Sequence, residues 1–176
     1  MNDTLSLQEL IEEGKSTYKR GDFLASARAY QAAAQGYQAT GDRLTAAEML
    51  NNASVAYLRT GDGAAALQAV EGTPEMFADA QDTHRQAIAL GNLGAALDAM
   101  KRLDEAVEAY QRSADLLGQA GEEDLRAHVL KSLSVLQLRK GDQMQAVATM
   151  QSSLEPGGKA NIFSRLLKRP PKQAGK

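Results

Sequence analysis

A glycine–acid pair recurs along this chain on a 20-residue grid. The pairs on this grid are Gly21-Asp22, Gly41-Asp42, Gly61-Asp62, Gly121-Glu122 and Gly141-Asp142. Glycine suits the left-handed conformation just past a helix end, and an acidic side chain after it accepts hydrogen bonds from the free N–H groups of the next helix. Each pair therefore predicts a helix end followed at once by a helix start. Gln81-Asp82 and Lys101-Arg102 stand at two further points of the grid, which we call degenerate because the glycine is absent there.

The grid predicts eight helices of similar length. Their expected ranges are 5–19, 23–39, 43–59, 63–79, 83–99, 103–119, 123–139 and 143–154. The composition supports this prediction, because the abundant Ala, Leu, Gln and Glu side chains lose little rotamer freedom in a helix. Short connections force consecutive helices to pack antiparallel as hairpins. The sequence therefore predicts an all-α protein built from helical hairpins.

The full repeat is 40 residues long, because alternate helices carry different patterns. Three of its columns are Leu10, Leu50, Leu90 and Leu130, then the small residues Gly14, Ser54, Gly94 and Ser134, then Tyr30, Val70, Tyr110 and Met150. Small residues in a fixed column let neighbouring helices approach closely, and the large ones fill the space between them. Four repeats, at about 3–42, 43–82, 83–122 and 123–155, exceed the roughly three that a stacked array needs. Residues 1–155 are thus expected to form one helical solenoid.

The clearest repeat resembles the tetratricopeptide repeat family. The residues that carry the resemblance are the bulky anchor Leu90, the pair Leu93-Gly94, and the small, aromatic and small residues Ala106, Tyr110 and Ser113. Leu97 replaces the aromatic residue that is usual on the first helix, and the closing proline is absent. The 40-residue unit exceeds the family's usual ~34 and is similar to the longer repeats of kinesin light chains. The resemblance implies a right-handed α-solenoid whose first helices line a concave groove.

Carried over column by column, the resemblance implies that polar and apolar residues of three helices line this groove. They are Glu48, Asn51, Asn52, Val55, Leu58 and Arg59, then Ile88, Gly91, Asn92, Ala95 and Asp98, then His128, Lys131, Ser132, Val135, Leu138 and Arg139. An apolar middle with polar groups around it suits a peptide or a helix laid along the groove. The small Gly91 and Ala95 predict a shallow wall that admits a bulky side chain. The alternative is that several of these residues simply pack between helices, and we expect about half to be exposed.

Pro74 interrupts the pattern within the expected helix 63–79. Proline lacks the backbone donor and clashes with the preceding turn, so this helix is expected to kink, or to restart with Thr73 as its cap and Pro74 in its first turn. Two interpretations of this interruption stay open. It is either a local change of packing, or a bend that changes the shape of the groove at the middle of the array.

Residues 156–176 differ from the repeats, since they carry six basic residues and no acidic one. As a short C-terminal tail helix, they place Ile162, Phe163, Leu166 and Leu167 on one side, and Arg165, Lys168 and Arg169 on the other. Because so short a helix is not stable by itself in water, its apolar side needs a partner. Three partners stay open: the uncovered end of the solenoid, an anionic membrane surface, or the array of this or a neighbouring copy.

The sequence holds no motif typical of an enzyme. His84 and His128 are the only histidines, and neither has a second histidine at the spacing of a zinc site on a helix. The chain has no cysteine, which excludes disulfides and thiolate metal sites, and it has no glycine-rich phosphate loop after a strand. We therefore expect neither catalysis, nor a metal, nor a cofactor.

The remaining expectations concern place and partner. The acidic N-terminal residues do not resemble a signal peptide, and no apolar run approaches the ~20 residues that span a bilayer, which favours a cytoplasmic protein of bacterial type. The acidic charge of the repeats argues against nucleic acid as a partner. We expect a non-enzymatic scaffold or adaptor that binds a protein or peptide segment in its groove and helps to assemble a larger complex. Weak contact of the tail with an anionic membrane, and self-association through the tail, are the alternatives.

Overall fold

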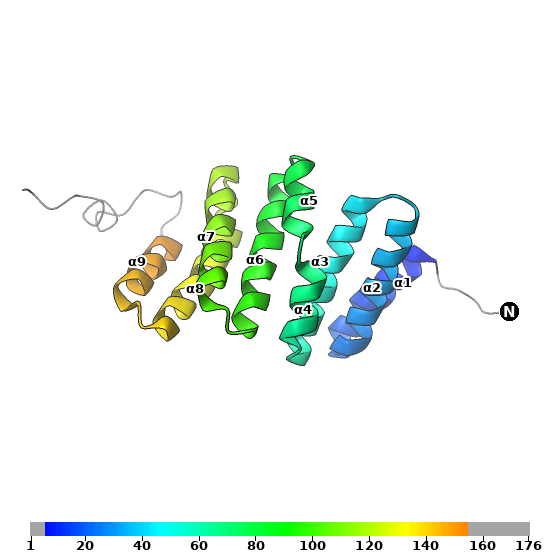
Figure 1. Ribbon diagram of the computed structural model, residues 1–176, viewed down its shortest axis with the longest axis horizontal. Helices are drawn as coiled ribbons and strands as arrows, with labels where there is room; N and C mark the ends of the chain where they lie inside the picture. The colour runs from blue at the N-terminus through cyan, green and yellow to red at the C-terminus, as the bar shows by residue number, and fades with distance from the viewer. Residues whose placement is uncertain (1–5, 155–176) are drawn as a thin grey trace, which may run out of the picture.

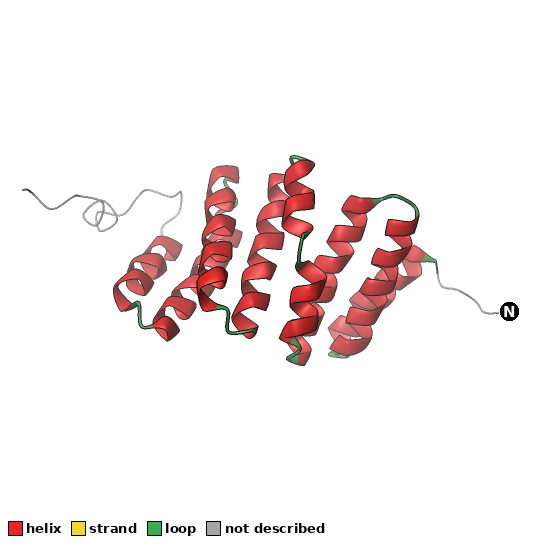
Figure 2. Cartoon of the chain, in the orientation of Figure 1, coloured by secondary structure: helices red, strands yellow, loops and turns green. Residues whose placement is uncertain are grey.

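The computed structural model describes residues 6–154, which form nine α-helices and no strand. The helices are α1 (Leu7–Arg20), α2 (Phe23–Ala39), α3 (Arg43–Thr60), α4 (Gly63–Val70), α5 (Thr73–Asp79), α6 (Thr83–Ala99), α7 (Leu103–Ala120), α8 (Glu123–Lys140) and α9 (Gln143–Leu154). Figure 1 shows them as hairpins that follow one another in chain order along the longest axis of the molecule, and Figure 2 shows the short loops that join them. This arrangement is the all-α solenoid that the repeats predict. The predicted tail, at 156–176, lies outside the described residues.

The helix boundaries follow the glycine–acid grid. The carboxylates of Asp22, Asp42 and Asp62 accept hydrogen bonds from the backbone N–H three residues later, at 3.2, 3.1 and 2.9 Å. The glycine before each of them has a positive φ of 84°. Gln81 and Lys101, at the degenerate points, adopt the same left-handed region with φ of 57° and 62°. The conformation of these turns therefore persists where the glycine is lost, at a cost in backbone strain.

The segment 63–79 forms two helices where an uninterrupted pattern would have given one, so the described chain has nine helices rather than eight. Helix α5 restarts with Pro74 in its first turn, as expected, but its cap is Gly72 in the left-handed region, not Thr73. The hydroxyl of Thr73 instead donates to the carbonyl oxygen of Val70 at 2.8 Å. The break is thus sealed by a buried hydrogen bond across it.

Small residues set the distance between the two helices of a hairpin. A β-carbon on Gly14 of α1 would lie 2.9 Å from the ring of Tyr30 on α2, and one on Gly94 of α6 would lie 2.9 Å from the ring of Tyr110 on α7. Both rings are almost fully buried. The same packing thus occurs in the first and third repeats, as the columns predict.

The first helices of the repeats are α1, α3, α6 and α8, and the rest form the second helices. Helix α6 packs against α3, α4 and α5 of the preceding repeat as well as against its own partner α7. The core clusters therefore meet between repeats: Ala96 of α6 belongs to the cluster of α1 to α4, and Leu67 and Leu93 pack against both this cluster and that of α6 to α8. The first helices α3 and α6 pack against each other, and an ion pair between Asp98 and Arg139 links α6 to α8.

Candidate binding groove

Two pockets lie along the first helices α3, α6 and α8, and we call them together the first-helix groove. The first pocket has a volume of about 340 Å³ and is lined by Glu48, Asn51, Asn52, Phe77, His84, Arg85, Ile88 and Asn92. The second has a volume of about 240 Å³ and is lined by Ile88, Gly91, Asn92, Ala95, Tyr110, Leu117, Leu125, His128, Val129 and Ser132. Ile88 and Asn92 belong to both linings, so the two pockets meet on the outward face of α6.

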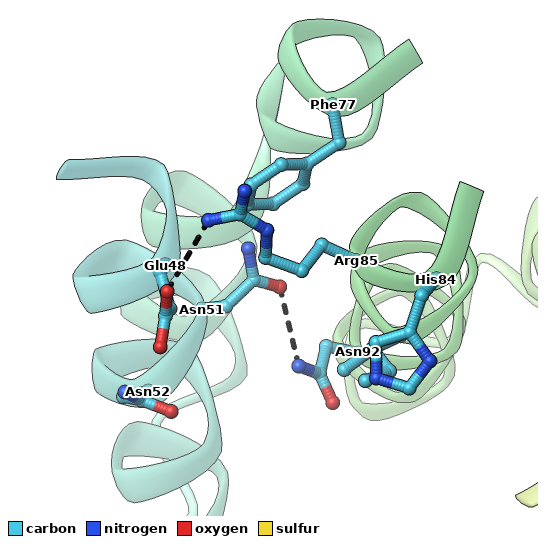
Figure 3. Close-up of a pocket in the computed structure, with 8 residues that line it drawn as sticks. Glu48, Asn51, Asn52, Phe77, His84, Arg85 and Asn92 are labelled. Atoms are coloured by element: carbon cyan, nitrogen blue, oxygen red, sulfur yellow. Dashed lines mark hydrogen bonds and ion pairs between the residues drawn. The ribbon is translucent and has the colours of Figure 1, made fainter. Parts of the chain in front are cut away.

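Asn51 forms the floor of the first pocket. It is 6% exposed, and its amide nitrogen donates to the carbonyl oxygen of Ala47 at 3.0 Å and to the hydroxyl of Thr73 at 2.9 Å. Its carbonyl oxygen accepts a hydrogen bond from the amide of Asn92 at 3.2 Å, drawn as a dashed line in Figure 3. Asn51 is therefore a buried residue that fixes α3, α5 and α6 together, rather than an exposed groove residue as the sequence suggests. Asn92 is half-buried and reaches the pocket from α6.

Arg85 closes one side of the first pocket. In Figure 3 its guanidinium lies between the ring of Phe77 and the carboxylate of Glu48, at 5.1 Å from the ring centroid and 3.4 Å from the carboxylate oxygen. Its Nε also donates to Asp82 at 2.6 Å, and this hydrogen bond raises the pKa of Arg85. Asp82 caps the helix by accepting a hydrogen bond from the backbone N–H of Arg85. This bond lowers the pKa of Asp82 most, and the hydrogen bond from the Arg85 side chain lowers it further. A charged arginine held on three sides is a fixed donor at the rim of the pocket.

The second pocket is mainly apolar. Its lining includes the buried Leu117 and Val129, and the small Gly91 and Ala95 line it on the α6 side. Tyr110 also lines it, and burial, followed by the nearby negative charge of Asp98, raises the pKa of Tyr110 to about 12. Such a site accepts a bulky apolar side chain, because that side chain displaces water from an apolar surface.

The residues predicted to line the groove divide into two groups. Those that line at least one of the two pockets are Glu48, Asn51, Asn52, Ile88, Gly91, Asn92, Ala95, His128 and Ser132. Those that line neither are Val55, Leu58, Arg59, Asp98, Lys131, Val135, Leu138 and Arg139. Asp98 and Arg139 form an ion pair between α6 and α8, beyond the second pocket. Val135 and Leu138 are exposed on α8.

The structure adds lining residues that the column pattern does not contain. Phe77 comes from α5, whose position depends on the break at 71–73, and Tyr110 and Leu117 come from a second helix. The alternation of the columns assigns Tyr110 to packing alone. The Tyr110 ring packs against Gly94 and also lines the second pocket, so it serves both purposes.

The histidines do not form a metal site. The Nδ1 atom of His84 lies 3.2 Å from a carboxylate oxygen of Glu122, which precedes α8 of the following repeat. Among residues 6–154, no three His, Cys, Asp or Glu side chains lie together as metal ligands would. His128 is exposed at the edge of the second pocket. Both histidines thus lie at the groove as potential contacts for a partner.

Comparison with known protein families finds a match for the C-terminal part of the repeats. The family model described as tetratricopeptide repeat matches residues 76–155, which run from within α5 to the end of α9 and include the whole second pocket. No curated protein sequence gives a significant match. None of the helices in the described part of the chain has the length and apolar character needed to cross a bilayer.

Proposed function

Because residues 76–155 match the tetratricopeptide repeat family, we propose that the protein is a non-enzymatic scaffold or adaptor that binds a segment of another protein in the first-helix groove. Tetratricopeptide repeats generally mediate interactions between proteins. The observation that carries the proposal is that two pockets of different character meet at Ile88 and Asn92. One offers fixed polar groups and the other an apolar floor, which is the combination that orients and anchors a peptide.

The polar groups favour an extended segment. Asn52, Asn92 and Ser132 occupy one column of the repeat, at 40-residue intervals, and all three line the groove. An amide or hydroxyl group recurring on successive helices can bond to the main chain of an extended peptide at intervals. Because such bonds do not depend on the partner's side chains, they supply affinity along the groove without selecting a sequence.

The apolar pocket favours one large anchor. A volume of about 240 Å³ holds a single bulky apolar side chain rather than a row of them. The partner is therefore expected to carry an aromatic or a large aliphatic residue that enters beside Gly91 and Ala95. Ordering a flexible segment costs free energy, so a micromolar dissociation constant is the expected order of affinity.

Selection from a random library of peptides of about 12 residues tests this proposal on the full chain. The selected peptides are measured by fluorescence anisotropy against the wild type, Ile88→Glu and a matched control, Leu24→Glu. Ile88 and Leu24 are both exposed, at 37% and 45%, but only Ile88 lies in the groove. Ile88→Glu is expected to weaken binding at least tenfold, because it brings a charge to the apolar anchor site. Equal binding to all three proteins would refute the groove as the binding site.

A further inference from the structure

The exposed apolar surface of the described chain is concentrated at its C-terminal end. Ten large apolar side chains are exposed between residues 6 and 154, and six of them lie from Val135 onward. Leu154 and Val147 on α9 are 69% and 55% exposed, and Val135 and Leu138 on α8 are each 52% exposed. We call Val135, Leu138, Val147, Met150 and Leu154 the end surface. Because exposed apolar surface at the end of a solenoid is unfavourable in water, we expect a further segment or partner to pack on it.

The repeat shows what covers the same columns elsewhere. Leu154 shares its column with Ala34, Pro74 and Ala114, all of which are buried. In the first repeat, Ala34 belongs to one core cluster with Met49 and Ala53 of the following helix α3. In the third repeat, Ala114 belongs to one cluster with Leu130 and Leu133 of the following helix α8. The end surface therefore matches the place where a further first helix would pack on α9.

The opposite end of the array differs in character. The outward residues of α1 include the exposed Glu9, Glu12, Glu13 and Lys15, and Lys15 pairs with Glu12 at 2.8 Å. Stacking α1 of a second copy on the end surface would remove these charges from water against apolar side chains, which is costly. This mismatch disfavours head-to-tail association as the way the end surface is covered.

We propose that the chain's own segment 161–169 covers the end surface as an amphipathic helix. Residues 155–176 follow Leu154 directly, and the six residues 155–160 can span about 20 Å when extended. Helix α9, with 12 residues, is only about 18 Å long. The linker contains Pro156, Gly157 and Gly158, which favour a change of direction. The segment can therefore turn back along α9.

The segment has the side chains for this contact. Ile162, Phe163, Leu166 and Leu167 share one helical side, and the basic residues face away from it. Nine residues are too few for a stable isolated helix, so docking and helix formation occur together. This inference goes beyond the proposed function, because it does not depend on whether the groove is occupied.

Urea unfolding of the full chain tests the contact by a double-mutant cycle. Phe163→Asp and Val147→Asp are each expected to lower the unfolding midpoint, and the double variant to lower it by less than the sum, because both break the same contact. The matched control is Ser164→Asp, which adds the same charge away from the apolar side and is expected to leave the midpoint unchanged. Additive effects, or an unchanged midpoint in Val147→Asp, would overturn the proposal.

Methyl NMR supplies a reading that does not depend on stability. The chain has three isoleucines, of which Ile11 lies in the core, Ile88 in the groove and Ile162 in the segment. Leu154→Asp is expected to move the δ1-methyl signal of Ile162 to the position typical of an unfolded peptide and to leave those of Ile11 and Ile88 in place. A signal of Ile162 that is already at that position in the wild type would contradict docking.

Two further results would assign the segment to another partner and overturn the proposal. The first is a wild-type dimer in sedimentation that dissociates on Phe163→Asp, which indicates contact between copies. The second is flotation with phosphatidylserine-containing vesicles that is lost on Phe163→Asp, together with a urea midpoint that Phe163→Asp leaves unchanged. A monomer whose midpoint is independent of concentration, and which does not float, supports the intramolecular contact.

Discussion

Gly94 and Tyr110 are in such close contact that no β-carbon fits between them: one placed on Gly94 would lie 2.9 Å from the Tyr110 ring. Tyr110 is 6% exposed, packs between α6 and α7, and also lines the second pocket. The spacing of these two helices and the shape of the pocket therefore depend on a single missing methyl group.

Gly94→Ala is expected to destabilise the protein by about 1–2 kcal/mol. Overpacking costs ~1–3 kcal/mol, and the higher helix propensity of alanine returns at most ~1 kcal/mol. The matched control is Gly118→Ala on α7, where the added β-carbon meets only the flexible side chain of Arg126 at 3.0 Å. That variant should be neutral or slightly stabilised. Equal urea midpoints for the two variants would contradict the close packing of Gly94 against Tyr110.

Lys101→Gly is expected to stabilise the protein by roughly 0.5–1 kcal/mol. Lys101 is exposed and has a φ of 62°, a region where a side chain costs ~1–2 kcal/mol, although glycine loses more backbone entropy on folding. Lys101→Ala keeps the β-carbon and serves as the control. Thermal unfolding of both variants checks the prediction, and a stabilised Lys101→Ala would show that charge rather than conformation is responsible.

Thr73→Val is expected to cost about 1–3 kcal/mol in the free energy of unfolding. The Thr73 hydroxyl donates to Val70 and accepts from Asn51, and all three groups are buried. The substitution keeps the shape of the side chain but leaves the Val70 carbonyl oxygen and one N–H of the Asn51 amide without a partner. Thr45→Val, at a half-buried threonine on α3, is the comparison. Chemical denaturation of both variants measures the difference, and a smaller loss for Thr73→Val than for Thr45→Val would count against this account of the break.

Tyr110 makes the protein less stable at high pH. Burial raises its pKa to about 12 in the folded protein, whereas the unfolded value is about 10. The neutral phenol is therefore favoured by folding, so its stabilisation is complete below pH ~10 and is lost as the pH rises through ~12. At pH ~11 the loss is about 1 kcal/mol. Tyr110→Phe should remove this part of the decline in urea midpoint between pH ~9 and ~11; an unaltered decline would show that other groups cause it.

Much of the fold follows from the sequence because its signals are local. The caps at Asp22, Asp42 and Asp62 act within one turn, so the grid predicts helix ends closely. The restart at Pro74 follows from its fixed backbone geometry. The cap at Gly72 was missed because a threonine before a proline is a common cap, whereas here Thr73 is buried and bonds backwards to Val70.

The groove follows from the sequence only in part, because its pockets depend on contacts between repeats. Ile88, Gly91 and Asn92, which the columns place on the outward face of one helix, line the two pockets. The columns do not reveal Phe77, whose place depends on how α5 packs against α3 and α6. Nor do the columns show that Asn51 is buried, because Thr73, which accepts its hydrogen bond, lies 22 residues away in the sequence.

The δ1-methyl signal of Ile88 tests the central claim most directly. Ile88 is the one isoleucine among residues 6–154 that lines the groove, and both pockets include it. Titration of the full chain with a peptide selected from the random library is expected to shift this signal in proportion to occupancy and to leave the core signal of Ile11 unchanged. A peptide that binds with the same affinity while the signal of Ile88 stays in place would show that the first-helix groove is not where this protein holds its partner.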